Sequence, residues 1–201
     1  MNLKFTVIKI VLTIIIIVLA YLIYESIMRP VRFNQAVYER EKAVISRLAD
    51  LRLSQQFYKR QYNHYTDSFD TLITFLKSGE IPVVSLIPDP TDTTFTRSIS
   101  DTLGFVNVAD SLFSRKVNFS VDSLRFIPFS GKKLFEIEAG KIERGGINVP
   151  VFEIRAHYNA FLKGLDAQLI VNLVKSREDI ERYPGLKVGS MQEPSTDGNW
   201  E

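Results

Sequence analysis

The chain has 201 residues, of which 45% are hydrophobic and 24% are charged, so its composition is that of a folded protein and excludes wholesale disorder. A formal charge of +2 is too small to indicate nucleic-acid binding, and the absence of cysteine excludes disulfides, thiolate metal sites and a cysteine nucleophile. The mean hydropathy of +0.01 excludes a protein with many membrane spans, but this average conceals a very uneven chain.

A long apolar stretch lies near the N-terminus. Val7–Tyr24 reads VIKIVLTIIIIVLAYLIY and is interrupted only by Lys9 and Thr13. At about 1.5 Å per residue, such a run nearly crosses the ~30 Å hydrocarbon core of a bilayer. We therefore predict a membrane anchor over residues 1–29, with Thr13 returning its hydroxyl to the helix backbone. The residues expected at the two membrane surfaces are Lys4, Lys9, Tyr21, Tyr24, Arg29 and Arg32.

Two alternatives concern this anchor. A cleaved signal peptide would use Val18-Leu19-Ala20 as its cleavage site, although the apolar run continues beyond it. Basic residues lie on both sides of the run, so they do not decide its orientation. A short basic segment before an uncleaved anchor favours a cytoplasmic N-terminus, and a head on the cytoplasmic side is the alternative.

A second helix is predicted after Pro30, because residues 31–65 contain neither glycine nor proline. Pro30 is expected to kink the junction or to begin a fresh helix. A partial heptad repeat aligns Val37, Val44, Leu48, Leu51, Gln55, Tyr58, Tyr62 and Tyr65. Only three or four heptads exist and Glu41 interrupts them, so we expect the distal half to pack on its own domain rather than form a free coiled coil.

Charge distinguishes this helix, residues 30–66, as a basic stalk. From Arg29 to Arg60 there are eight basic and three acidic residues, whereas the chain from Gln61 onward has fifteen basic and nineteen acidic ones. A basic helix beside a membrane can contact anionic lipid or an acidic partner, and a solvated helix face is the alternative. Candidate partner-binding residues are Tyr58, Tyr62 and Tyr65, which share one helix face; a packing seam is the favoured interpretation of that face.

Residues 67–189 are predicted to form an α+β head with a small antiparallel sheet and short helices, followed by a loose polar tail over residues 190–201. Phe69–Leu76 is expected to be a helix capped by Asp67 or Ser68 and ended by Gly79. The other expected elements are an extended segment at 81–84, an irregular loop at 88–102, an amphipathic turn at 106–113, extended chain at 124–129, a hairpin of strands 133–142 and 149–161, and a helix at 166–182 that could instead be a strand. Trp200 is the one tail residue expected to dock.

The sequence offers little for catalysis. His64 and His157 are the only histidines, and neither belongs to a metal-ligand spacing. We interpret His157 as structural and His64 as a cation at a helix end. No G-x-S-x-G motif supports a serine hydrolase. We therefore predict no enzyme activity, no metal and no cofactor.

Two resemblances suggest a setting. The segment LRLSQQFYKRQYNHYTDSFDTLITFL, together with the order of anchor, amphipathic helix and sheet, resembles type IV pilins and pseudopilins. The segments VDSLRFIPFS, VPVFEIRA, YPGLKVGS and GNWE resemble motifs of uncharacterised bacterial single-pass membrane proteins. The second resemblance implies a bacterial envelope setting, in which the expected cytoplasmic N-terminus places the anchor in the inner membrane and the head in the periplasm.

The sequence thus predicts a non-catalytic structural or interaction protein, and the pilin resemblance implies assembly in the manner of a pseudopilin. Its expected partners are the lipid bilayer and envelope proteins, or further copies through the stalk helix. A membrane-tethered binding module for a peptide, glycan or lipid is the alternative, and a deep pocket in the head would favour it. An exposed apolar patch or an open sheet edge would instead favour protein assembly.

Overall fold

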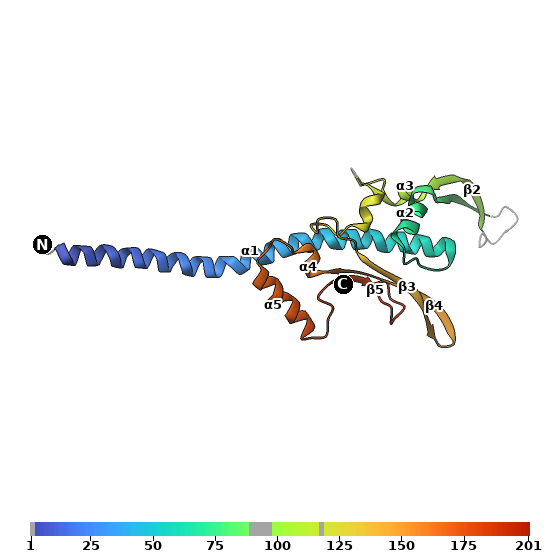
Figure 1. Cartoon of the computed structure of the whole chain (residues 1–201). Helices are drawn as coiled ribbons and strands as arrows, with labels where there is room; N and C mark the ends of the chain where they lie inside the picture. Colours follow the sequence, from blue (N-terminus) through green and yellow to red (C-terminus); the bar gives the residue numbers. More distant parts are fainter. Residues whose placement is uncertain (1–2, 89–97, 117–118) are drawn as a thin grey trace.

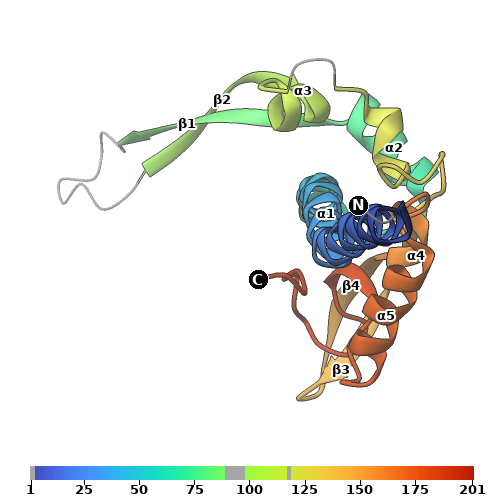
Figure 2. The same cartoon turned by 90° about the vertical axis from the view of Figure 1, so that its left-hand side faces the viewer.

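One helix organises the whole molecule. The computed structural model describes residues 3–88, 98–116 and 119–201, and for 3–7, 84–88 and 98–102 it describes the main chain alone. Helix α1 (Leu3–Tyr62) projects its N-terminal half away from the rest of the chain, and its second half runs through the head (Figure 1). The helix is continuous across Pro30, so no fresh helix begins there. Its two halves lie along different directions (Figure 2), and a proline, which removes one helical hydrogen bond, is an ordinary cause of such a bend.

The second half of α1 forms the centre of the hydrophobic core. Its buried apolar side chains are Phe33, Val37, Val44, Leu48, Leu51 and Tyr58, and all of them except Phe33 lie at the predicted heptad positions. They belong to one cluster with residues of both halves of the head. The expectation that this half packs on its own domain is confirmed, because the seam faces the head of the same chain. The charge-based division into stalk and head therefore does not match the core, which residues 30–66 share with the head.

Two small sheets lie on opposite sides of α1 (Figure 2). On one side, β1 (Glu80–Pro88) and β2 (Ser98–Asn107) form a two-stranded antiparallel ribbon beside α2 (Phe69–Ser78) and α3 (Val108–Phe113). On the other side, β3 (Glu136–Arg144), β4 (Ile147–His157) and β5 (Gly185–Gly189) form a three-stranded antiparallel sheet in that order. Helices α4 (Tyr158–Phe161) and α5 (Ala167–Glu178) accompany this second sheet. The predicted α+β class is confirmed.

The predicted hairpin is confirmed. Ile137 pairs with Ile154 and Glu138 with Glu153 in the β3–β4 ladder. Because side chains alternate along a strand, the first pair faces the core and the second lies on the outer face. Gly145 and Gly146 make the connecting turn with φ of 62° and 79°, values that favour glycine.

Helix caps follow the sequence closely. Ser68 caps α2 by accepting from the amide of Thr71, and Gly79 follows the last turn as expected. Asp166 caps α5 by accepting from the amides of Gln168 and Leu169, which excludes the strand alternative for this segment. Helix α5 ends at Glu178 and is therefore shorter than the predicted 166–182.

Three sequence predictions in the head are wrong. Residues 98–102 of the predicted loop belong to β2, because β1 pairs with them and supplies hydrogen bonds that local composition does not indicate. Residues 89–97 of that loop lie outside the described chain. Extended chain was expected at 124–129, but its first two residues belong to a 3-10 turn, η1 (Val121–Arg125), since the Ser123 amide and hydroxyl both bond the Ser120 carbonyl. Strand β4 ends at His157, and the predicted continuation to residue 161 is helix α4.

Strand β5 was not anticipated, and it holds the C-terminal residues in place. Gly189 has a φ of 77°, and a Cβ there would lie 2.3 Å from the carbonyl oxygen of Phe152, so only glycine fits this approach to β4. The Gly189 amide donates to Asp197, and the Asn199 amide donates to Lys187. Trp200 packs partly buried against the core. The docking of Trp200 is confirmed, while the expectation of a loose tail is wrong for this part.

Candidate functional site

The apolar half of α1 presents its side chains outward. None of the apolar window is buried, and the helix is long and apolar enough to cross a membrane, which fits a single-pass membrane or signal-anchor protein. Tyr21 and Tyr24 are 63% and 56% exposed, as side chains facing lipid headgroups would be. Lys9 is exposed, and its carbonyl accepts the predicted hydrogen bond from Thr13 at 2.9 Å. The side chain of Lys4 lies outside the described residues.

The two arginines predicted at the membrane surface both form ion pairs. Arg29 pairs with Asp166, the cap of α5, and its Nε donates to the carboxylate at 2.6 Å. Arg32 pairs with Glu25, which lies two turns earlier on the same helix. The first of these pairs joins the end of the apolar run to the head, a contact that the sequence did not reveal.

Further arginines of the basic zone also bind the head. Arg40 donates to the carbonyl oxygens of Phe161 and Lys163 at 2.8 and 3.0 Å. Arg47 donates to the hydroxyl of Ser123 at 2.8 Å and to its carbonyl oxygen, and Arg52 pairs with Glu201 at 2.7 Å. The sequence predicted either a lipid or partner surface or a solvated face, whereas these guanidinium groups hold the head onto α1. The missed signal is that several of the excess cations are arginines, whose forked donors suit carbonyl and carboxylate acceptors.

The three candidate tyrosines do not form one surface. The rings of Tyr58 and Tyr62 lie 4.6 Å apart and both contact Phe75 of α2. Tyr65 lies beyond the helix end, where the centroid of its ring is 4.6 Å from that of the Phe152 ring. Tyr58 and Tyr65 are buried and Tyr62 is 49% exposed, so two of the three serve packing within the chain.

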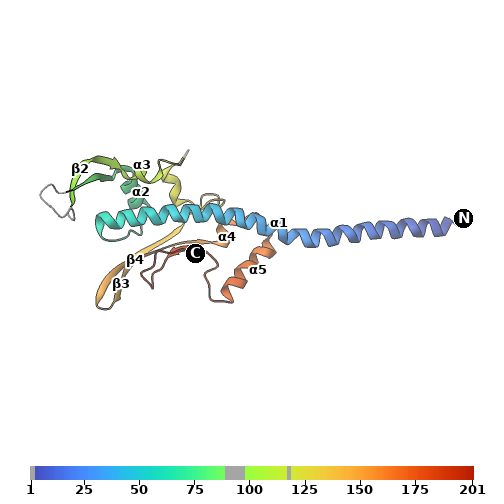
Figure 3. The same ribbon diagram turned by 180° about the vertical axis from the view of Figure 1, so that it is seen from behind.

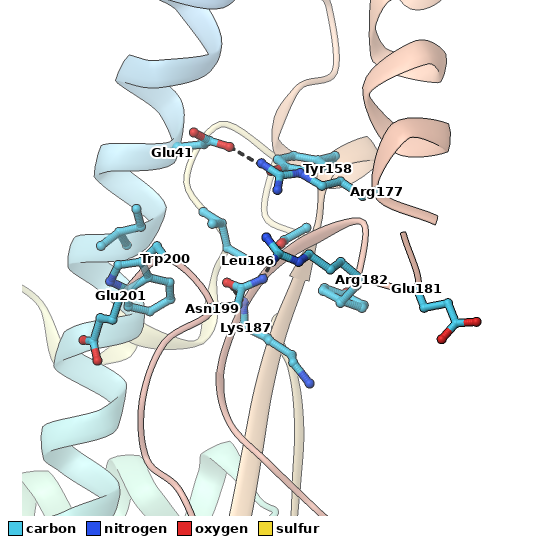
Figure 4. Close-up of a pocket in the computed structure, with 13 residues that line it drawn as sticks. Glu41, Tyr158, Arg177, Glu181, Arg182, Leu186, Lys187, Asn199, Trp200 and Glu201 are labelled. Carbon is cyan, nitrogen blue, oxygen red and sulfur yellow. Dashed lines mark hydrogen bonds between the residues drawn. The ribbon is translucent and has the colours of Figure 1, made fainter. Parts of the chain in front are cut away.

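The clearest cavity lies between α1, α5 and β5 and has a volume of about 430 Å³ (Figure 4). Tyr158 donates its hydroxyl to Glu41 at 2.9 Å across this space. Burial, and then the Glu41 carboxylate, raise the pKa of Tyr158 to about 12. Arg177 and Arg182 turn their guanidinium groups into the cavity, and Glu181 points away from it.

The lining of this cavity has charges of both signs. The cationic side chains are Arg177, Arg182 and Lys187, and the anionic ones are Glu41, Glu201 and Glu181, the last of which points away from the cavity. Glu201 already pairs with Arg52, and Lys187 with Glu153 at 3.0 Å. The volume is in the range of small-molecule sites, about 300–1,000 Å³, but the walls are mainly polar rather than apolar. The cavity is built from α1, α5 and β5 and differs from the deep pocket that the sequence hypothesis required.

The ribbon β1–β2 carries an exposed apolar surface. Leu103 and Phe105 are 68% and 66% exposed, and Leu103 is the unpaired residue at a β-bulge, where the register shifts between Val83 and Val84. Pro82 pairs with Phe105, while the neighbouring Ile81 packs against the core. Figure 2 shows the ribbon extending away from α1, with strands that have no further neighbour in the described chain.

The histidines have structural surroundings. His157 accepts from the amide of Asn159 at 3.1 Å and so caps α4, and His64 bonds the Tyr62 carbonyl at 2.8 Å. Among the described residues, both rings therefore bond main-chain groups rather than a serine or carboxylate. No group of three or more histidines or carboxylates able to hold a metal ion occurs in that part of the chain.

Comparisons with known proteins supply no relative from which a site could be transferred. No protein-family model, no curated protein and no solved structure matches the chain. The resemblances to pilins and to bacterial single-pass proteins therefore stay predictions. The candidate sites of this molecule are the membrane end of α1, the ribbon and the polar cavity.

Proposed function

We propose that this protein is a non-catalytic, membrane-anchored interaction protein of the bacterial envelope whose ribbon β1–β2 binds a partner protein. The observation that carries the proposal is the exposure of Leu103 and Phe105 on that ribbon. The anchor is α1, spanning the inner membrane once with its N-terminus in the cytoplasm and the head in the periplasm.

The ribbon has the properties of a protein-binding element. A two-stranded sheet is only marginally stable in water by itself, so a third strand or a covering surface would stabilise it. Its edges are unpaired within the described chain, and unpaired strands are templates for strand addition. Exposed apolar side chains such as Leu103 and Phe105 are typical of residues that become desolvated at the centre of an interface.

We further propose that the protein is a pseudopilin-like assembly component, and the arrangement of α1 supports this. The helix leaves the apolar region and continues directly into the core, where it packs beside the sheet β3–β4–β5 (Figure 3). Because this helix is continuous and no flexible linker interrupts it, it would fix the distance and orientation of the head relative to the membrane. Assembly would then proceed through the head, because most heptad positions of α1 are already covered by its own chain.

A photo-crosslinking amino acid at position 103, introduced in intact cells, tests the ribbon directly. The same residue at position 148, at the turn of the β3–β4 hairpin, is the matched control because Asn148 is also exposed. We expect an adduct of discrete mass from position 103, little from 148, and loss of that adduct when Phe105→Ser is added. Two differently tagged copies in one cell show whether the partner is a second copy. Equal crosslinking from both positions, insensitive to Phe105→Ser, would contradict the proposal.

The alternative, a tethered module for a small ligand, would place that ligand in the cavity beside Tyr158. An Arg177→Ala variant would impair such a module and leave ribbon crosslinking unchanged, whereas Phe105→Ser would have the opposite effect. Reporter fusions at the C-terminus, active only in the periplasm or only in the cytoplasm, test the orientation separately.

A further inference from the structure

The base of the head reaches the level of the apolar run. Helix α5 begins beside α1 and is the part of the head nearest to the N-terminal half of that helix (Figures 1 and 3). Its cap residue Asp166 pairs with Arg29. Gln168 and Leu169 of its first turn line a groove of about 420 Å³ together with Leu22, Ser26 and Pro30 of α1.

The depth of this groove follows from helix geometry. About twenty residues of α-helix cross the ~30 Å hydrocarbon core, so a span that begins at Phe5 ends at Tyr24. Arg29 then lies about 7 Å beyond the core, within the headgroup layer. Because the groove extends from Leu22 to Pro30, it begins inside the hydrocarbon edge and opens among the headgroups.

No free stalk separates this groove from the head. Phe33 is only 8% exposed and Val37 is equally buried, so the packed core begins one turn after Arg29. The Arg40 bonds to Phe161 and Lys163 hold the chain just before α5 against α1. The first turn of α5 therefore cannot be lifted from the membrane without breaking these contacts.

From this placement we propose that a bilayer phospholipid fills the groove between α1 and α5, and that the head rests on the membrane surface. Leu22, Leu169 and Pro30 would contact the upper part of an acyl chain, and Ser26 and Gln168 offer hydrogen bonds to the glycerol esters. The occupant is a lipid because the groove is continuous with the lipid-facing surface of the span. This inference rests on the membrane span and is independent of the ribbon.

The charges around the groove select a neutral lipid. Arg29 is paired with Asp166, and Arg32 with Glu25, so each cation has an anionic neighbour. A zwitterionic phospholipid is thus sufficient, and an anionic headgroup should bring no further attraction.

The absence of cysteine allows a clean test, because a single introduced cysteine is the only labelling site. A fluorophore at Gln168→Cys would report the groove, and one at Asn148→Cys would report the far hairpin. The full-length protein is reconstituted in phosphatidylcholine vesicles that contain lipids with a nitroxide either near the headgroup or near the acyl-chain end. Since Gln168 is exposed, its replacement should not disturb folding.

We expect the label at position 168 to be quenched several-fold more than that at 148, and more strongly by the nitroxide near the headgroup. A Leu12→Cys label in the middle of the span should show the reverse depth preference, which verifies insertion. Equal, weak quenching at 168 and 148, with quenching by aqueous iodide at both, would overturn the proposal. Stronger quenching at 168 after an anionic phospholipid is added would overturn the neutral-lipid assignment. Ala167→Cys gives an independent second position in the same turn.

Discussion

Arg29 of α1 and Asp166 at the start of α5 are joined by an ion pair that bridges 137 positions of sequence. The same carboxylate accepts from the main-chain amides of Gln168 and Leu169 at 3.0 and 3.2 Å. The hydrogen bond from Arg29, and then that from the Leu169 amide, lower the pKa of Asp166 from its ordinary value of 3.8. One side chain thus caps α5 and also fixes that helix to the membrane end of α1.

Replacing Asp166 should separate these two roles. An asparagine at this position could still cap the helix but would lack the charge, so Asp166→Asn should weaken the contact with α1 and leave most of the α5 cap intact. Asp166→Ala removes both interactions and should increase amide hydrogen exchange in the first turn of α5 several-fold more than Asp166→Asn does. Hydrogen exchange of the full-length protein in detergent measures this difference.

The same pair predicts an acid dependence. Because the folded-state pKa is lowered, its stabilising contribution is present above pH 3.8 and is lost as the pH falls through the folded value. Protection of the α5 first turn, corrected for intrinsic exchange rates, should therefore decline in this acid range. The decline should be smaller in Asp166→Asn, and an identical decline in both proteins would show that other groups cause it.

Gln55 holds the turn that follows α1. Its side chain is fully buried; Nε2 donates to the carbonyl of Thr66 at 2.6 Å, and Oε1 accepts from the Thr66 amide at 3.1 Å. Gln55→Leu would leave two buried main-chain groups without partners, so we expect the free energy of unfolding to fall by about 2–4 kcal/mol. Denaturant unfolding in detergent, followed by circular dichroism, measures the loss.

The neighbouring glutamine is the control for this change. Gln56 makes a single weak contact with Thr196 at 3.5 Å and is half-buried. Gln56→Leu should therefore change the stability by less than about 0.5 kcal/mol. If both variants lost the same stability, the paired hydrogen bonds to Thr66 would not be the cause.

The sequence predicted those features that depend on local pattern. The heptad positions of α1, the Ser68 cap and the β3–β4 hairpin each follow from residue type and spacing along one segment. Gln55 also fell on the heptad seam, but the sequence could not show that its amide would meet Thr66.

The missed features depend on partners distant in sequence. Strand β5 is only five residues long and is a strand because β4 pairs with it, while residues 98–102 are extended because β1 lies beside them. The arginine contacts were hidden for the same reason, since the spacing of Arg40 does not reveal carbonyl acceptors more than 120 positions away. The composition of the basic zone showed an excess of positive charge, but it did not show that the arginine side chains bind the head.

Arg40 offers a fourth test. Its two hydrogen bonds to carbonyl oxygens and its position over the Phe129 ring, 5.3 Å from the centroid, are made to the head. Arg40→Ala should lower the free energy of unfolding by about 2–3 kcal/mol, the typical loss for hydrogen bonds to a charged group. Lys42→Ala removes the same charge from an exposed position on the same helix and should have little effect. Comparable losses in the two variants would indicate that net charge, rather than these contacts, matters.

Tyr158 and Tyr183 provide the final test, because both have a pKa raised to about 12, chiefly by burial, but only Tyr158 donates a hydrogen bond to a carboxylate in the described structure. A folded-state pKa above the unfolded value of 10.0 gives stability that is complete below pH 10.0 and is lost as the pH rises toward about 12. Either Tyr→Phe change should make the alkaline loss of stability shallower.

At neutral pH, Tyr158→Phe should lower the free energy of unfolding by about 1–2 kcal/mol, because the Glu41 carboxylate loses its donor, and Tyr183→Phe should lower it by less. Unfolding curves at neutral and alkaline pH distinguish the two effects, and equal stability of both variants at neutral pH would show that the Glu41 bond does not stabilise the fold.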